Sequence, residues 1–160
     1  MPIKVGDRLP NAKFRVGTPE GPAWKTTDEI FKGKKVALFA VPGAFTGTCH
    51  KMHVPSITQH ADAIKAKGVN TVALTSVNDV FVMDAWKKAT GADKIDFLAD
   101  GNGDFAKAID LTFDGSGNGL GTRSKRYAML VEDGVVKKLN IEEAPGKVEV
   151  SGGDALLKQL

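Results

Sequence analysis

The chain has 160 residues, of which 42% are hydrophobic and 26% are charged, with 18 glycines and 7 prolines. These values are typical of one domain, residues 1–160, and exclude a collagen repeat, a coiled coil and a wholly disordered chain. The net charge of +3 is too small to indicate a nucleic-acid partner. No apolar run approaches the roughly 18–20 residues of a membrane span, and the chain opens without a signal-like apolar core. We therefore expect a soluble cytoplasmic protein, or a mature form from which a leader has been trimmed, with no membrane partner.

Apolar runs and helical periodicity, separated by glycine and proline, divide the chain into short elements. In chain order they are a strand at 12–16 in a loop-rich start, a capped helix at 26–31, a buried strand at 35–41, a helix from 48 to 67, a strand at 71–77, a helix from 78 or 79 to 90, a strand at 95–99, a helix at 103–110, a glycine-rich loop at 114–122, a hairpin of strands 127–131 and 135–139, and a final helix that Ser151 caps and that ends at Gln159.

Two of these elements carry further expectations. The helix that begins at Thr48 has Pro55 within it, which predicts a kink or a later true start. Its periodicity turns apolar side chains inward; they are Met52, Ile57, Ala61 and Ile64. The hairpin near the C-terminus is predicted by the Asp133-Gly134 pair between its two strands, since Asp-Gly favours a tight turn.

The order of these elements predicts an α/β fold with a central mixed β-sheet flanked by helices. After the first short elements, the order βαβαββα is that of the thioredoxin fold, here with an N-terminal extension. Reactive loops of such sheets lie at the carboxyl ends of the parallel strands. Cys49 follows the strand at 35–41 and opens the next helix, so it lies where a site is expected.

Cys49 is the one cysteine of the chain, which excludes an internal disulfide framework and a zinc site of several cysteines. It is therefore either a small buried hydrophobic residue or a reactive thiol. The first turn of a helix presents free backbone N–H groups and the positive end of the helix dipole, and both stabilise a thiolate. The position alone favours the reactive thiol.

The residues around Cys49 resemble the active-site pattern of the peroxiredoxins, Pro42-x-x-x-Thr46-x-x-Cys49. The wider string resembles their type II subfamily and extends from about Ile3 to Leu160. It comprises Pro42–Thr46, His53–Pro55, Ser76–Asp79, Leu98–Asp100 and Gly121–Arg123 with Arg126.

This resemblance implies a thiol peroxidase that reduces hydrogen peroxide and alkyl hydroperoxides. Cys49 would attack the peroxide and become a sulfenic acid. Thr46 would hydrogen-bond the peroxide, Pro42 would shield the sulfur from water, and Arg126 would stabilise the thiolate and hold the peroxide. These donors for the developing charge need no metal or organic cofactor. The resemblance also implies a homodimer, with Phe45 in the region that forms the contact between the two subunits.

Recycling of Cys49 requires an external thiol because the chain has no second cysteine. At one position where relatives carry a resolving cysteine, this chain has Leu74. The expected reductants are glutathione with glutaredoxin, or thioredoxin. The alternative is a redox sensor or chaperone-like module that is switched by oxidation of Cys49. Steady turnover with a reductant distinguishes the enzyme from this alternative, because a sensor is oxidised only once.

Other residues near Cys49 have simpler interpretations. A Cys–His hydrolase needs His53 within reach of the sulfur and a third orienting group, so a packing or hydrogen-bonding role is favoured for His53. Arg123 is expected to pair with a carboxylate near the site. Glu142 and Glu143 are interpreted as a solvated acidic pair, and Trp86 as a core or interface residue.

Overall fold

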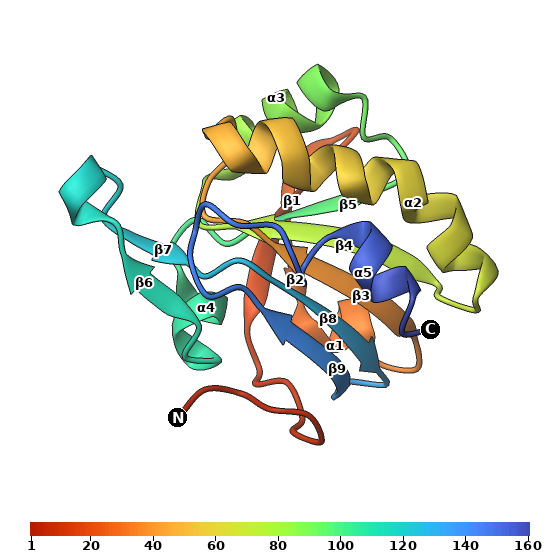
Figure 1. Ribbon diagram of the computed structural model, residues 1–160. Coiled ribbons are helices and arrows are strands. Elements are labelled where there is room, and N and C mark those ends of the chain that lie inside the picture. The colour runs from red at the N-terminus through yellow and green to blue at the C-terminus, as the bar shows by residue number, and fades with distance from the viewer.

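The computed structural model, which describes residues 1–160, is a seven-stranded mixed sheet with helices on both faces (Figure 1). The strands lie in the order β2-β1-β5-β4-β3-β8-β9. Their bounds are β1 (Lys13–Thr18), β2 (Gly21–Thr26), β3 (Lys35–Ala40), β4 (Thr71–Ser76), β5 (Asp96–Ala99), β8 (Tyr127–Glu132) and β9 (Val135–Ile141). β3, β4 and β5 are parallel to one another, and the outer strands are antiparallel to their neighbours. The α/β thioredoxin-like fold with an N-terminal extension is therefore confirmed.

The remaining elements are short helices and a small hairpin, and most follow the sequence prediction within a few residues. They are α1 (Thr27–Phe31), the π-helical turn η1 (Cys49–His53), α2 (Val54–Ala66), α3 (Val80–Thr90), α4 (Asp104–Ala108), β6 (Thr112–Asp114), the 3₁₀ turn η2 (Ser116–Asn118), β7 (Thr122–Ser124) and α5 (Gly153–Leu157). None of the helices combines the length and the apolarity that a membrane crossing requires.

The sheet separates two apolar cores because successive side chains of a strand point to opposite faces. In β3, Ala37 and Phe39 belong to the core beneath α2, α3 and α5, whereas Val36 and Leu38 belong to the core with α1 and α4. Figure 1 shows α2 and α3 over one face and α1 and α4 on the other side. A strand covered on both faces must be apolar throughout, which is why residues 35–41 read as one continuous run.

The antiparallel pairing of β3 with β8 brings two distant segments to the same edge of the sheet. Ala40, the last residue of β3, lies opposite Tyr127, the first residue of β8. The loop that leads from β3 to Cys49 and the residue that precedes β8, Arg126, therefore meet at the carboxyl end of the parallel strands. The register of one strand pair thus builds the neighbourhood of Cys49.

Three parts of the prediction were wrong. Residues 21–26 form the edge strand β2 rather than loop, and residues 112–124 contain the β6–β7 hairpin where only a glycine-rich loop was expected from 114 to 122. The final helix ends at Leu157, and its N-cap is Gly152 without a side-chain hydrogen bond. Ser151 instead uses its hydroxyl elsewhere, as described below.

The helix that follows Cys49 begins with a π-helical turn, and this changes the face that Met52 occupies. Pro55 stands in the first turn of the regular helix α2, where the missing N–H costs nothing. The wider π turn over Cys49–His53 inserts an extra residue, so the inward periodicity of α2 does not extend back through it. Met52 is consequently 56% exposed, whereas Ile57, Ala61 and Ile64 are buried as predicted.

Candidate active site around Cys49

Cys49 lies at the start of the helical segment, with a side chain that is only 1% exposed. The loop before it is held by the carboxyl end of β4. Asn78 Oδ1 accepts a hydrogen bond from the backbone N–H of Ala44 at 2.9 Å and another from Ser76 Oγ at 2.6 Å. The site therefore presents a sheltered thiol on a loop that the sheet fixes in place. In the sequence, Asn78 was one possible start of the helix that ends at residue 90 and belonged to the string that resembles type II peroxiredoxins.

Arg126 is the charged partner of the thiol. Its Nη2 donates to Cys49 Sγ at 3.0 Å, and its side chain is buried although arginine is usually exposed. Nε and Nη2 both donate to the carbonyl of Pro145, at 3.1 and 2.8 Å, and Nη1 donates to His53 Nδ1 at 2.8 Å. Four hydrogen bonds thus use four of the five N–H donors of the guanidinium. One N–H on Nη1 remains for another acceptor.

Arg126 forms no ion pair with a carboxylate. Its other acceptors are neutral, namely a carbonyl and an imidazole. Of the acceptors that the guanidinium contacts, only the sulfur of Cys49 can carry a negative charge, so Arg126 is placed to stabilise negative charge that develops there.

His53 is fully buried and has both ring nitrogens in use. Arginine can only donate, so Nδ1 must accept the bond from Arg126, and Nε2 carries the proton that it donates to the carbonyl of Ser151 at 2.7 Å. Burial, and then the charge of Arg126, lower the pKa of His53 to about 3. His53 is therefore a neutral hydrogen-bonding residue, as expected, and neither nitrogen is free to act as a base for Cys49.

Thr46 and Pro42 lie in the loop before Cys49. The Thr46 hydroxyl donates to the carbonyl of Gly43 at 2.6 Å, so its proton is committed and its oxygen is left as an acceptor. Thr46 was expected to donate a hydrogen bond to the peroxide, but its hydroxyl already donates to a carbonyl of its own loop. Pro42 is buried, and its carbonyl accepts a hydrogen bond from Arg123 Nη1 at 3.1 Å.

Arg123 does not pair with a carboxylate, contrary to the expectation. Its Nε donates to the carbonyl of Leu120 while Nη1 reaches Pro42, so it ties the β6–β7 hairpin to the active-site loop. Gly43 makes this approach possible, because a Cβ there would lie 2.7 Å from Arg123 Nη1 and 2.9 Å from Thr46 Cγ2.

An aromatic stack lies next to Cys49 in sequence, between the loop before it and the turn that contains it. The ring of Phe45 is 49% exposed and stacks on His50, with ring centroids 5.8 Å apart. Phe45 has a positive φ of 62°, an uncommon conformation for a bulky residue. His50 Nδ1 in turn accepts a hydrogen bond from Trp86 Nε1 at 2.9 Å. Trp86 is a core residue, as predicted, and it anchors the turn that contains Cys49.

Glu142 was expected to be solvated, and the structure contradicts this. The residue is 7% exposed, and its Oε2 accepts four hydrogen bonds, from the backbone N–H groups of Glu149, Val150 and Ser151 and from Ser151 Oγ. Burial raises the pKa of Glu142, but these hydrogen bonds outweigh it and leave the pKa below its usual value. Glu143 is exposed, as expected.

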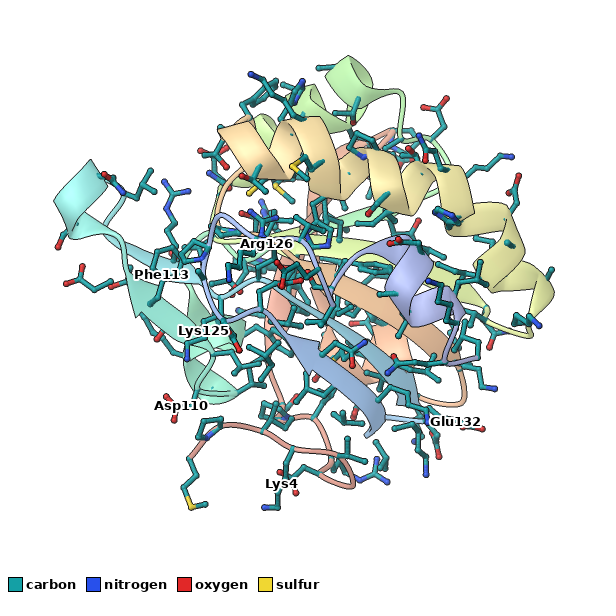
Figure 2. The ribbon with its side chains drawn as sticks, in the orientation of Figure 1. Lys4, Asp110, Phe113, Lys125, Arg126 and Glu132 are labelled. Carbon is teal, nitrogen blue, oxygen red and sulfur yellow. The ribbon has the colours of Figure 1, made fainter.

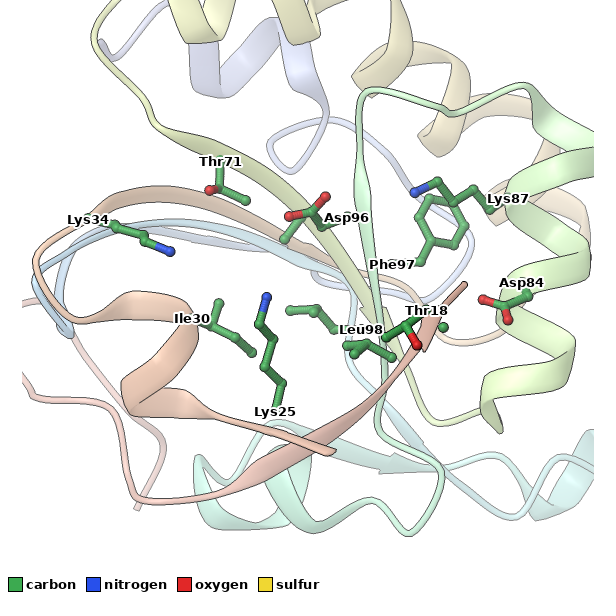
Figure 3. A pocket seen from close by; sticks show the side chains of 13 residues that line it. Thr18, Lys25, Ile30, Lys34, Thr71, Asp84, Lys87, Asp96, Phe97 and Leu98 are labelled. Carbon is green, nitrogen blue, oxygen red and sulfur yellow. The ribbon is translucent and has the colours of Figure 1, made fainter. Parts of the chain in front are cut away.

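A second gathering of charged residues lies at the opposite end of the parallel strands (Figure 3). This pocket has a volume of about 210 Å³ and opens where β1 and β5 diverge, since these strands pair only at Arg15 and Ala99. Its charged lining residues are Lys25, Lys34, Lys87, Asp84 and Asp96. None of them forms an ion pair. We call it the lysine pocket.

Comparison with known proteins places these observations in context. The family model described as Redoxin matches residues 4–157. Peroxiredoxin-2C of Oryza sativa subsp. japonica is 45% identical over 99% of this chain and 99% of its own length. Peroxiredoxin-2E-2, chloroplastic, of the same plant is 45% identical over 99% of this chain and 72% of its own.

Among solved structures, the reduced Prx3 from Vibrio vulnificus in complex with H2O2 superposes with a TM-score of 0.94. It is 49% identical in sequence, and the match covers 98% of this chain and 98% of that chain.

Proposed function

Because the chain belongs to the redoxin family and, within it, to the type II peroxiredoxins, we propose that Cys49 is the peroxidatic residue of its thiol peroxidase activity. The activity itself follows from the family. The assignment to Cys49 is supported by one observation above all, the 3.0 Å hydrogen bond from the buried Arg126 guanidinium to the only thiol of the chain.

The proposed first step is attack of the Cys49 thiolate on one oxygen of a hydroperoxide. An S–O bond forms as the O–O bond breaks, and the electron pair of that bond leaves on the second oxygen. Cys49 becomes a sulfenic acid, and the leaving oxygen takes up a proton to give water or an alcohol. Hydrogen peroxide and organic hydroperoxides are the substrates, and we propose that no resident metal or organic cofactor takes part.

Arg126, Thr46 and Pro42 each have a proposed part in this step. Arg126 stabilises the thiolate, and its remaining N–H donates to the peroxide, where negative charge develops. Thr46 accepts a hydrogen bond from the peroxide O–H, since its own proton is held by Gly43. Pro42, buried beside the loop, shields the sulfur from water. Two polar groups and a shield are then supplied by residues that the fold already fixes.

The proposed recycling uses an external thiol. Glutathione attacks the sulfenic sulfur, a mixed disulfide forms and water leaves; a second thiol, from glutaredoxin or glutathione, then releases Cys49. Thioredoxin is the alternative reductant. Because the sulfur is 1% exposed, the turn at residues 48–50 must open before a thiol of this size can reach it.

Peroxide consumption with glutathione and glutaredoxin, and separately with thioredoxin, tests the proposal. Steady turnover with one of the two systems is expected. If Cys49 is oxidised only once and neither system sustains turnover, the protein is a redox switch instead. Intact mass after stepwise peroxide and glutathione should show one glutathione adduct per chain. An oxidised disulfide between two Cys49 residues, with no adduct, would contradict the recycling route.

We further propose a homodimer and a cytoplasmic location. Two exposed aromatic side chains, Phe45 in the loop before Cys49 and the 71% exposed Phe81 in α3, support the dimer. Sedimentation of Phe45→Ala against the unaltered chain tests it. One of the relatives named above is chloroplastic, so the location is tested separately by fractionation of the source cells.

A further inference from the structure

A closed circuit of hydrogen bonds surrounds Arg126, and most of it lies outside the active-site pattern. We propose that Glu142 and His53 are positioning residues, which hold the Arg126 guanidinium against Cys49 by ordering the segment of residues 145–151. This inference rests on the proposed function of Arg126 and Cys49. Figure 2 shows Arg126 within the molecule, beneath the segment that leads to α5, whereas Lys4 and Glu132 lie at the periphery.

The first half of the circuit runs through His53. Its Nδ1 accepts from Arg126 Nη1, and its Nε2 donates to the Ser151 carbonyl. The ring is therefore locked in one tautomer and one orientation between the guanidinium and the segment 145–151. A neutral ring is essential here, because an imidazolium would lose its acceptor nitrogen and place a second positive charge 2.8 Å from Nη1.

The second half runs through Glu142. Its carboxylate gathers three consecutive N–H groups, of residues 149–151, and the Ser151 hydroxyl, and so fixes the end of the segment that carries the Ser151 carbonyl. Its own backbone N–H donates to the carbonyl of Arg126 at 3.0 Å. Glu142 is thus bonded to Arg126 through the backbone and to its supporting segment through the side chain.

The segment itself supplies the acceptors that aim the guanidinium. Pro145 contributes a carbonyl with two of the four bonds that Arg126 makes, and Ser151 contributes the carbonyl that orients His53. The side chain of Pro145 is exposed, so little packing holds this residue. If the carboxylate of Glu142 is neutralised, its hydrogen bonds to residues 149–151 weaken, and the Ser151 carbonyl that orients His53 loses its anchor. The segment that also carries the Pro145 carbonyl is then held at one end fewer, and the guanidinium is no longer fixed at the sulfur.

The test compares Glu142→Gln with Glu143→Gln, a matched change at the next residue, which is exposed and makes no side-chain hydrogen bond. The readouts are the rate of Cys49 oxidation by hydrogen peroxide, the pH profile of Cys49 alkylation by iodoacetamide, and the urea midpoint of unfolding. Cys49 is the only thiol, so alkylation reports on it alone.

Glu142→Gln should slow oxidation about tenfold, the order seen when an outer hydrogen-bond partner is lost, and move the alkylation profile to higher pH. Glu143→Gln should change neither.

Two substitutions of His53 separate positioning from mere packing. In His53→Asn the amide oxygen takes the place of Nδ1 and still accepts from Arg126, whereas His53→Gln places its amide near Nε2 and loses that acceptor. Oxidation should therefore be faster in His53→Asn than in His53→Gln, at similar urea midpoints. This pair decides the matter if Glu142→Gln does not fold.

The proposal is overturned if Glu142→Gln lowers the urea midpoint but oxidises and alkylates like Glu143→Gln, or if the two His53 variants oxidise at equal rates. Arg126→Ala is measured in the same series. If that variant oxidises as fast as the unaltered chain, the proposed function of Arg126 itself is wrong, which is a separate outcome.

Discussion

The surroundings of Cys49 and the lysine pocket both gather charged side chains, at opposite ends of the parallel strands. Beside Cys49 the side chains of Arg126, His53 and Glu142 are buried. Each of their side-chain N–H groups and acceptors has a defined partner except one N–H of Arg126 and one oxygen of Glu142. In the lysine pocket five charged side chains line one cavity without forming an ion pair (Figure 3). The difference lies in the fixed geometry of the groups rather than in the amount of charge, because only fixed groups can be aimed at a reacting atom.

The largest effect is expected at the sulfur itself. Cys49→Ser should abolish peroxidase turnover and leave the urea midpoint close to that of the unaltered chain, because a hydroxyl is not ionised near neutral pH and is a poor nucleophile. Peroxide consumption with the reducing system supplied in excess is the measurement. Turnover by the serine variant would remove Cys49 from the mechanism and, with it, the basis of the contrast between the two regions.

The second effect concerns the charge that faces the sulfur. Arg126→Ala should slow oxidation of Cys49 by about 10²–10³, the loss typical of one donor at a developing charge. Arg126→Lys should restore part of it, since an ammonium cannot reproduce the planar fork that reaches Pro145, His53 and Cys49 together. Lys125→Ala is the matched control, because that side chain is exposed beside it (Figure 2). Rates of Arg126→Ala and Lys125→Ala within threefold of each other would contradict this role.

The burial of Arg126 explains where the sequence alone was sufficient and where it was not. The apolar run of β3 and the Asp-Gly turn of the β8–β9 hairpin are local signals, and the structure follows them. Asp133 and Gly134 have the positive φ angles that such a turn needs. A lone arginine before a strand carries no local sign that it will be buried. Only the resemblance to a family pointed to Arg126, and the strand register then placed it.

The sequence missed elements whose partners are remote or whose signal is weak. β2 is an edge strand with no buried face, so it lacks the apolar alternation that predicts a strand. Glu142 follows a strand and precedes another glutamate, a pattern typical of solvent-exposed side chains. Its partners are mainly backbone N–H groups seven to nine residues later, and backbone donors leave no trace in a pattern of side chains.

A third effect, on stability, depends on pH. His53 has a pKa of about 3 in the folded chain and about 6.5 when unfolded, so the unfolded chain binds the extra proton first as pH falls. Stability is therefore complete above about pH 6.5 and falls by about 1.4 kcal/mol per pH unit between roughly pH 6 and pH 4 from this residue alone. Glu142, whose folded pKa is also lowered, acts in the same direction at lower pH.

The free energy of unfolding in urea, measured from pH 7 to pH 4 for the unaltered chain and for His53→Asn, checks this expectation. The variant should be less stable at pH 7 but should lose less on acidification, so the two curves converge. Parallel curves would show that His53 does not carry the proton.

The smallest effect is expected in the lysine pocket, where Lys25→Ala and Lys34→Ala each remove one positive charge. Both side chains are exposed and unpaired, and surface substitutions of this kind change stability by no more than about 0.5 kcal/mol. The pocket lies at the amino ends of β4 and β5, whereas Cys49 lies at the carboxyl end of the parallel strands. Solvent and salt therefore screen the electrostatic effect of these lysines at the sulfur. Oxidation of Cys49 should stay within threefold of the unaltered rate at both low and high salt. A larger, salt-dependent change would mean that the electrostatic field of these lysines affects the rate of Cys49 oxidation. Fixed hydrogen bonds would then not be the property that distinguishes the surroundings of Cys49 from the lysine pocket.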